Sequence, residues 1–134
     1  MIEKLKEADD SEKWQCYRNL GKTEELKKNY KNAIKYFTQA LEYTEESNKG
    51  FTLQKLGECQ IKTDFFDNGI KNLTIAAKLQ PFEEAKIYRK IGEFYEKKGN
   101  LSKTIDYFEK AMKINPKIGV KRKLSTYKEQ LKME

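Results

Sequence analysis

Apolar residues recur along the chain with the spacing of amphipathic helices. The stretch GNLSKTIDYFEKAMKINP (residues 99–116) carries the apolar stripe of a helix and closes on Pro116, which a helix interior does not accommodate. A similar but weaker form of this pattern, NYKNAIKYFTQAL, lies at residues 29–41. Near the C-terminus, Val120, Leu124, Tyr127 and Leu131 fall on one further stripe. The pattern therefore predicts a chain of helices that ends in an amphipathic helix.

The helical pattern is organised as three copies of one motif. Each copy contains a large aliphatic residue followed by glycine, and the glycines of successive copies, Gly21, Gly57 and Gly92, are 36 and 35 residues apart. Because this period is typical of helical repeat proteins, we predict that each copy is a pair of helices. At fixed distances after each glycine stand a small or short residue (Ala33, Gly69, Thr104), a large apolar residue (Phe37, Leu73, Phe108) and an alanine (Ala40, Ala76, Ala111).

Small and helix-breaking residues predict how these pairs pack and end. We expect each glycine to let its helix come close to the small residue of the partner helix. Pro81 and Pro116 are expected to end the second helices of the second and third copies. Turns are predicted at residues 27–29 (KKN) and 98–100 (KGN), where some residues tolerate left-handed backbone angles, and loops at residues 44–50 and 81–85.

Composition raises one alternative, which is disorder. The chain of 134 residues is 37% charged and 37% hydrophobic, and high charge with low hydrophobicity opposes collapse. Seven Phe, eight Tyr and one Trp at helical spacing argue for a packed core instead. With helix-favouring Lys, Glu, Leu and Ala abundant and only two prolines, the predicted fold class is all-α.

The two cysteines and the single tryptophan are predicted to have structural roles. Cys16 and Cys59 have no CxxC spacing, so we expect free thiols, packed as small apolar side chains in a reducing compartment. For Trp14 we favour packing over a role in binding. No segment has the length of a membrane span and the first residues do not resemble a secretory signal, so we expect a cytoplasmic protein with no membrane partner.

Residues that carry chemistry are sparse. The chain contains no histidine, and its isolated glycines do not form a phosphate-binding loop. Adjacent carboxylates such as Glu24 and Glu25 are expected to be solvated surface charge. We therefore predict a protein that is not an enzyme and has no catalytic residue, cofactor or metal site.

The three copies resemble the tetratricopeptide repeat (TPR), whose pattern is W-x₂-L-G-x₂-Y, A-x₃-F and P. Glu24 and Gln60 replace the aromatic residue after the glycine in the first and second copies. The resemblance implies an α-solenoid of three TPR helix hairpins in a right-handed superhelix, closed by a C-terminal capping helix. The third copy matches best, with Tyr88, Ile91, Gly92, Tyr95, Thr104, Phe108, Ala111 and Pro116.

The resemblance also suggests the boundaries of the repeats. We predict a single TPR domain over residues 1–134, because one hairpin cannot cover its own apolar face and about three are needed. Its parts are an N-terminal segment or cap (1–13), three repeats (14–47, 50–83 and 85–118) and the capping helix (119–134).

A groove lined by the first helices of the hairpins is the predicted binding site. Counting from the glycines gives more basic than acidic side chains there, and Lys and Arg pair well with carboxylates. In some TPR domains that dock the acidic C-termini of heat-shock chaperones, a clamp of basic, Asn, Asn, Lys and Lys or Arg holds the carboxylates. The matching residues here are Arg18, Lys22, Lys55, Lys86 and Lys90, so both Asn positions have become Lys. The predicted groove residues are Arg18, Asn19, Lys22, Gln54, Lys55, Lys86, Arg89 and Lys90.

These observations favour a TPR adaptor or scaffold that binds a peptide or helix of another protein, with an acidic C-terminal tail as one candidate. The alternative is a structural subunit or fragment of a larger assembly, and a co-chaperone of the clamp type is a third reading. The net charge of +7 predicts nonspecific attraction to polyanions at low salt. No aromatic-interleaved basic motif points to a specific nucleic-acid partner.

Overall fold

A computed structural model describes residues 9–133 of the chain, and this range contains seven α-helices and no strand. The predicted all-α class is therefore confirmed. The chain divides into two compact units, Met1–Leu79 and Gln80–Glu134, which are described separately. The first unit contains α2 (Asp10–Leu26), α3 (Tyr30–Glu42), α4 (Glu46–Gln60) and α5 (Phe66–Leu79), and the second contains α6 (Glu84–Lys97), α7 (Leu101–Ile114) and α8 (Lys121–Lys132).

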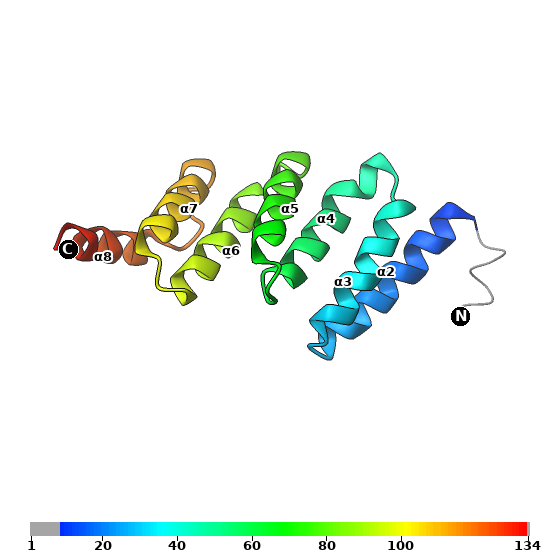
Figure 1. Ribbon diagram of the computed structural model, residues 1–134. Helices are drawn as coiled ribbons and strands as arrows, with labels where there is room; N and C mark the ends of the chain where they lie inside the picture. Colours follow the sequence, from blue (N-terminus) through cyan, green and yellow to red (C-terminus); the bar gives the residue numbers. More distant parts are fainter. Residues whose placement is uncertain (1–8, 134) are drawn as a thin grey trace. The chain divides into compact units, whose positions relative to one another are not determined.

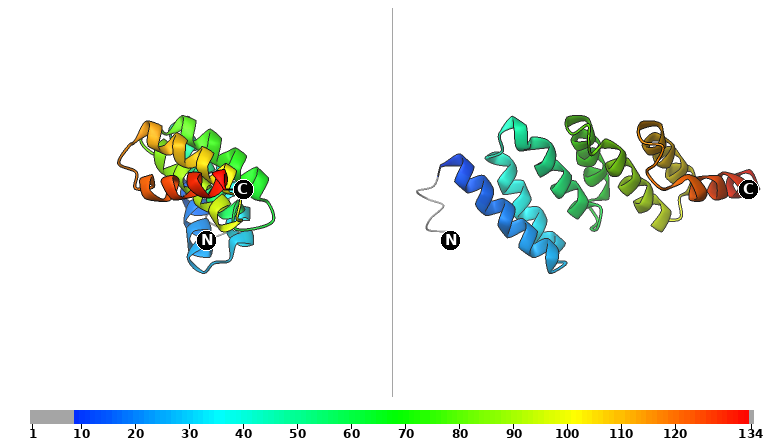
Figure 2. Two further views of the ribbon diagram at one scale, coloured as in Figure 1. Left: turned by 90° about the vertical axis from the view of Figure 1, so that its left-hand side faces the viewer. Right: turned by 180° about the vertical axis from the view of Figure 1, so that it is seen from behind.

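The first unit consists of two helix hairpins packed on each other. Helix α2 pairs with α3, α4 pairs with α5, and α3 packs against α4 (Figures 1 and 2). A core of Ala33, Phe37, Leu56 and Cys59 joins the hairpins, because α3 supplies the first two residues and α4 the last two. Each hairpin thus covers an apolar face that the other leaves open.

The second unit is one hairpin followed by a further helix. Helix α6 pairs with α7, and α8 packs against α7. The hairpin buries Ile87 and Ile91 from α6 with Phe108 and Ala111 from α7, each with no exposed surface. These residues recur at three- and four-residue intervals, as the core face of a helix requires.

The repeated glycines are close-approach positions, but not always to the small residue that the sequence suggested. A Cβ on Gly57 would lie 2.8 Å from the carbonyl oxygen of Gly69, so here two backbones meet as predicted. A Cβ on Gly21 would instead lie 2.7 Å from the ring of Phe37, and one on Gly92 would lie 2.5 Å from the ring of Phe108. In the first and third hairpins the glycine therefore makes room for an aromatic ring of the second helix.

The turns inside the first and third hairpins share a left-handed residue. Gly99 has a φ of 76°, and Lys28 occupies the equivalent place with a φ of 61°. Glycine adopts this conformation freely, whereas lysine has a Cβ that crowds the following carbonyl oxygen. The predicted turns are confirmed, with lysine rather than asparagine taking the left-handed angle.

Helix ends follow the expected signals at most places. Helices α5 and α7 stop two residues before Pro81 and Pro116, and Asn100 caps α7 by accepting a hydrogen bond from the amide of Lys103. The loop predicted at residues 44–50 is wrong, since α4 begins at Glu46, where no residue breaks a helix. The predicted loop at 81–85 is likewise shorter, because α6 begins at Glu84.

The predicted N-terminal segment at residues 1–13 is only partly within the described range. Residues 1–8 lie outside the described residues. Asp9 accepts a hydrogen bond from the amide of Glu12 and so caps α2, whose first turn begins at Asp10. Residues 10–13 are therefore part of the first helix of the hairpin.

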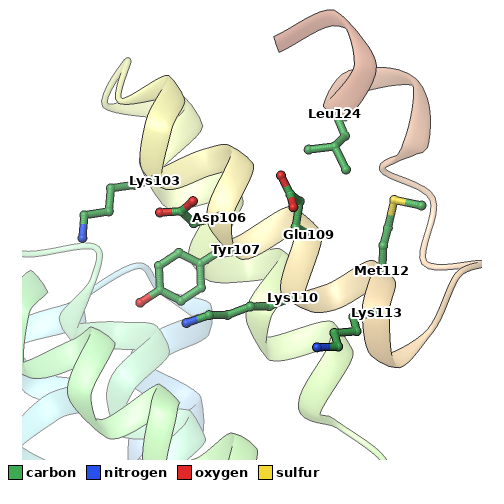
Figure 3. Close-up of a pocket in the computed structure, with 8 residues that line it drawn as sticks. All are labelled: Lys103, Asp106, Tyr107, Glu109, Lys110, Met112, Lys113 and Leu124. Carbon is green, nitrogen blue, oxygen red and sulfur yellow. The ribbon is translucent and has the colours of Figure 1, made fainter. Parts of the chain in front are cut away.

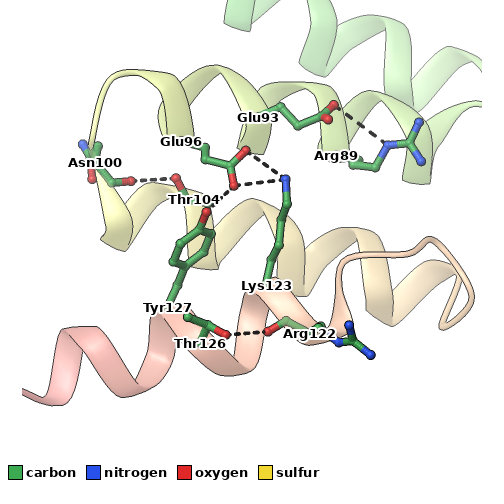
Figure 4. A network of polar contacts seen from close by, with 9 residues as sticks. All are labelled: Arg89, Glu93, Glu96, Asn100, Thr104, Arg122, Lys123, Thr126 and Tyr127. Carbon is green, nitrogen blue, oxygen red and sulfur yellow. Dashed lines mark hydrogen bonds and ion pairs between the residues drawn. The ribbon is translucent and has the colours of Figure 1, made fainter.

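Helix α8 is held by apolar residues at its start and by polar contacts farther along. Val120 and Leu124 are buried, whereas Leu131 is 40% exposed, so only part of the predicted stripe is covered. Glu96 of α6 accepts a hydrogen bond from the hydroxyl of Tyr127, and both of its carboxylate oxygens lie 3.3 Å from Nζ of Lys123 (Figure 4). Ion pairing and hydrogen bonding thus extend the attachment beyond the last buried leucine.

Candidate functional site

The predicted groove residues lie on the first helix of each hairpin, and we call the residues that each unit contributes its first-helix face. In the second unit these residues all lie on α6. In the first unit they lie on two helices, α2 and α4. The members are Arg18, Asn19 and Lys22 on α2, Gln54 and Lys55 on α4, and Lys86, Arg89 and Lys90 on α6.

Two contacts bring α2 and α4 together beneath this face. The indole Nε1 of Trp14 donates a hydrogen bond to Oγ1 of Thr52 at 3.0 Å. Nζ of Lys55 lies 3.6 Å from Oε1 of Glu25, across the same helix pair. Trp14 is buried, so its predicted packing role is confirmed, and its hydrogen bond satisfies the polar end of the ring.

Arg18 is held in position by the residues around it. Its guanidinium lies over the Trp14 ring, 4.8 Å from the centroid, and Nη2 donates to Oδ1 of Asn19 at 3.4 Å. Its Nε is buried, so only the terminal Nη groups of this half-buried side chain can reach a partner. Arg18 therefore presents a planar, oriented pair of donor groups, and the exposed Lys22 lies one helical turn farther along.

Lys55 has local carboxylate partners. Its Nζ lies 3.6 Å from Glu25 and 3.8 Å from Glu58, and Gln54 also donates to Glu58. Glu58 is only 8% exposed, so its charge is incompletely screened by water. Two carboxylates outnumber the one ammonium here, so the surroundings of Lys55 are not basic.

The cysteine beside this cluster is a structural residue. Burial raises the pKa of the Cys59 thiol to about 12, and the charges of Glu25 and Glu58 act in the same direction. A thiol in this state is not a nucleophile at neutral pH. The predicted apolar role is confirmed for Cys59, whereas Cys16 is half-buried.

On α6 the three predicted residues differ in their surroundings. Lys86 is exposed and Lys90 is half-buried. Nη1 of Arg89 donates to the carbonyl oxygen of Ile118 at 3.2 Å, and its Nε lies 4.0 Å from Glu93 (Figure 4). Arg89 thus ties α6 to the segment that precedes α8, in addition to any role at the surface.

Residues 9–133 contain no group of three or more His, Cys, Asp or Glu side chains that could hold a metal ion. No helix in this range is both long and apolar enough to cross a membrane.

The family model for the tetratricopeptide repeat matches residues 15–47 and 85–118, which together make up half of the chain. The chain belongs to the tetratricopeptide repeat family. The resemblance seen in the sequence is thereby confirmed, and so is the fold class, an α-solenoid of TPR helix hairpins. TPR repeats generally serve as non-catalytic modules for protein interaction.

A solved TPR structure shares this fold. The TPR2AB domain of yeast Sti1, in complex with pHSP90, is 20% identical with a TM-score of 0.70, over 90% of this chain and 48% of that chain. The present chain thus spans about half the length of the Sti1 chain. The MamA protein is 17% identical with a TM-score of 0.46, over 89% of this chain and 90% of that one. None of the curated proteins matches the sequence.

The TPR model matches the ranges of the first and third copies but not that of the second. The second copy has Gln60 in place of the aromatic residue, Gly69 in place of alanine and Leu73 in place of phenylalanine. Helices α4 and α5 nevertheless form a hairpin, because Gly57 and Gly69 let the backbones meet and Leu73 is fully buried. Substitutions that preserve close packing have kept the hairpin while weakening the motif.

Sequence reasoning counted acidic side chains on the first helices but did not pair them with Lys55. The pair with Glu58 could have been recognised, since Glu58 lies three residues after Lys55 on one helix. Glu25 is thirty residues from Lys55 in the sequence, and only the packing of α2 beside α4 brings the two together.

Proposed function

We propose that this chain is a non-enzymatic TPR adaptor or scaffold that binds a peptide or helix of a partner protein on its first-helix face. TPR hairpins commonly present such surfaces, and the candidate residues are polar side chains on regular helices. The Sti1 domain, which shares the fold, is in a complex with pHSP90, and this supports a protein partner for the present chain.

The observation that carries this proposal is the state of Arg18. Arg18 is half-buried, and the terminal Nη groups of its planar guanidinium can donate to a carboxylate or carbonyl of a partner in the two-pronged geometry that arginine favours. Trp14 and Asn19 hold the group in one orientation, so little side-chain entropy is lost on binding. The neighbouring Lys22 adds positive charge, which favours a carboxylate.

An acidic segment is the partner chemistry that these groups support best. Arg18 and Lys22 in the first unit and Lys86 in the second are cationic, and the latter two are exposed. The chaperone-tail mode is less well supported, because Lys55, at the third clamp position, already pairs with Glu25 and Glu58. The Lys residues at both Asn positions also lack the amide groups of that clamp.

The test is an affinity pull-down with a charge-reversed face. The double variant Lys22→Glu and Lys86→Glu should lose the partners that the unaltered protein retains. Its control is Lys31→Glu with Lys35→Glu, which changes the net charge equally at two exposed positions of α3. Quantitative mass spectrometry of the bound proteins compares the three.

A second variant examines Arg18 directly. Arg18→Lys keeps the positive charge but removes the planar set of donors, so retention of the same partners should weaken. If the control variant loses the same partners, they bind through the overall net charge of the protein and not through the first-helix face. If neither face variant loses any, the first-helix face is not the binding surface.

A structural role in a larger assembly is the second candidate, and the surface of α5 favours it. Ile75 is 39% exposed and Leu79 is 46% exposed on this helix, and Phe65 just before it is also exposed. Exposed apolar residues of this kind often mark subunit contacts. The double variant Ile75→Lys and Leu79→Lys should then release co-purifying subunits, whereas the first-helix variants should not.

A further inference from the structure

The second unit has a hollow on α7 that lies apart from the first-helix face. It is an open depression of about 590 Å³, formed by one side of α7 together with Leu124 of α8 (Figure 3). We call it the α7–α8 pocket and define it by its basic residues, Lys103, Lys110 and Lys113, and its apolar residues, Tyr107, Met112 and Leu124. None of these six residues belongs to the predicted binding site.

The apolar part of the pocket is partly rigid and partly adaptable. The ring of Tyr107 stacks on that of Tyr95, with centroids 5.8 Å apart, and Nζ of Lys110 lies 4.8 Å from the Tyr107 centroid. Met112 has a flexible, polarizable side chain that fits ligands of varied shape. Met112 lies beside Leu124, on a different side of α7 from Tyr107 (Figure 3). An apolar side chain of a ligand would therefore find its adjustable contact at Met112 and Leu124.

The charge around this apolar part is positive. Within residues 9–133, neither Lys103 nor Lys113 takes part in an ion pair with a carboxylate. Of the two acidic residues in the lining, Glu109 pairs with Lys128 at 3.4 Å, so Asp106 is the acidic residue that offsets the charge of the lining lysines. The net charge of the second unit is also positive, because residues 80–134 hold fourteen Lys and Arg against eight Asp and Glu.

The set of three lysines occurs together only in this hairpin of the three. Counted from the repeated glycine, the positions of Lys103, Lys110 and Lys113 are occupied by Asn32, Gln39 and Glu42 in the first hairpin and by Asn68, Ile75 and Lys78 in the second. The fold needs no lysine at any of these positions, since the first hairpin forms without them. The three lysines are therefore free to serve a surface role.

We propose that the α7–α8 pocket is a second docking surface, which takes a short acidic segment of a partner protein with one apolar or aromatic side chain among its carboxylates. Charge complementarity with the lysines selects the acidic residues, and Met112 with Leu124 receives the apolar one (Figure 3). Lys103 and Lys113 are ten residues apart, about 15 Å along a helix, which an extended peptide spans with about five residues. Because Asp106 and Glu109 lie among the lysines, a ligand whose charges are interrupted by an apolar side chain fits better than the uninterrupted run of phosphates of a nucleic acid.

The test uses the full chain labelled with ¹⁵N and the acetylated, amidated peptide DEWED, followed by amide chemical shifts. Saturable shifts should appear at Tyr107, Met112 and Leu124. The double variant Lys103→Glu and Lys113→Glu should weaken binding by at least about tenfold. The control variant Lys31→Glu with Lys35→Glu, which carries the same net charge on α3, should bind as the unaltered protein does.

Two further ligands separate the outcomes. The peptide DEAED has the same charge without the aromatic anchor and should bind more weakly than DEWED. A single-stranded oligonucleotide should not produce the same shifts. The proposal is overturned if DEWED gives no saturable shifts at the pocket, if DEAED or the oligonucleotide binds there equally well, or if the control variant loses binding as the pocket variant does. Because Lys22 and Lys86 do not line this pocket, reversing their charge leaves DEWED binding in place, so the two proposals fail independently.

Discussion

Single residues decide how the helices of each hairpin meet. Gly92 shows this most clearly, because the ring of Phe108 occupies the space where any other residue would place its Cβ. Glycine in a helix usually costs stability relative to alanine, so helix propensity alone would favour alanine at residue 92. Close packing with a fully buried aromatic ring outweighs that preference.

Replacing Gly92 by alanine should therefore destabilise the protein. The new methyl group would lie 2.5 Å from Cδ1 of Phe108, and overpacking of this kind costs about 1–3 kcal/mol, more than the gain in helix propensity. Urea unfolding followed by circular dichroism measures the difference. Combining Gly92→Ala with Phe108→Leu should cost less than the sum of the two single variants, and simple additivity would contradict the contact.

Lys28 is a residue in a conformation that suits glycine. At a φ of 61°, lysine strains the folded state by about 1–2 kcal/mol. Glycine removes this strain, but the larger entropy of the unfolded chain lowers the free energy of unfolding by about 0.5–1 kcal/mol. Lys28→Gly should thus raise the free energy of unfolding by about 0.5–1 kcal/mol and the melting temperature by about 2–4 °C. Thermal unfolding checks this, and Lys27→Gly, at a residue with a right-handed φ of −79°, should lower the melting temperature instead.

At the scale of elements, the attachment of α8 differs from the packing inside the hairpins. The hairpins interlock through fully buried residues such as Phe37 and Phe108. Helix α8 buries Leu124 alone among its own residues, and Lys123 and Tyr127 reach the carboxylate of Glu96. Its docking should consequently respond to pH.

The pH dependence follows from the bond between Tyr127 and Glu96. The hydrogen bond to Glu96 raises the pKa of Tyr127 above its ordinary value of 10.0, because ionised Tyr127 could no longer donate. Since the folded pKa is the higher one, this stabilisation is complete below about pH 10 and is lost as the pH rises through the folded pKa. The difference in melting temperature between the unaltered protein and Tyr127→Phe should therefore narrow in that alkaline range.

Glu96→Gln provides the matched variant. Without the carboxylate, the pKa of Tyr127 should fall toward its ordinary value, as a titration of ¹³C-labelled tyrosine would show. An unchanged pKa in this variant, or a melting difference that does not vary with pH, would mean that the bond does not hold α8.

For the whole molecule, covering the apolar ends of the units matters for solubility. Ile118, Val120 and Leu124 are buried in the segment that covers α7. A chain that ends at Pro116 loses all three and should aggregate, because the apolar surface that they cover becomes exposed. Light scattering measures this, and removal of residues 132–134 alone should leave the protein soluble. A soluble, equally stable chain ending at Pro116 would contradict this role of α8.

Charge is also unevenly distributed over the whole molecule. Residues 1–79 hold fourteen basic and thirteen acidic residues, whereas residues 80–134 hold fourteen and eight. Most of the net charge of +7 therefore belongs to the second unit, which contains Lys86 and the α7–α8 pocket. Acidic partners are favoured there by the general field as well as by local groups.

The sequence by itself determined the helices, their pairing and the repeat family, because these follow from periodic apolar residues and from glycine and proline at fixed intervals. It also located Arg18, Lys55 and Lys86 on the first helices, since position along a helix is a local property. Only the tertiary structure decided which charges meet. Glu25 forms an ion pair with Lys55, Arg89 donates a hydrogen bond to Ile118, and Glu96 accepts one from Tyr127. Each of these pairs joins two segments that are distant in the sequence. Such pairs depend on the packing of whole helices, which the pattern of one segment does not encode.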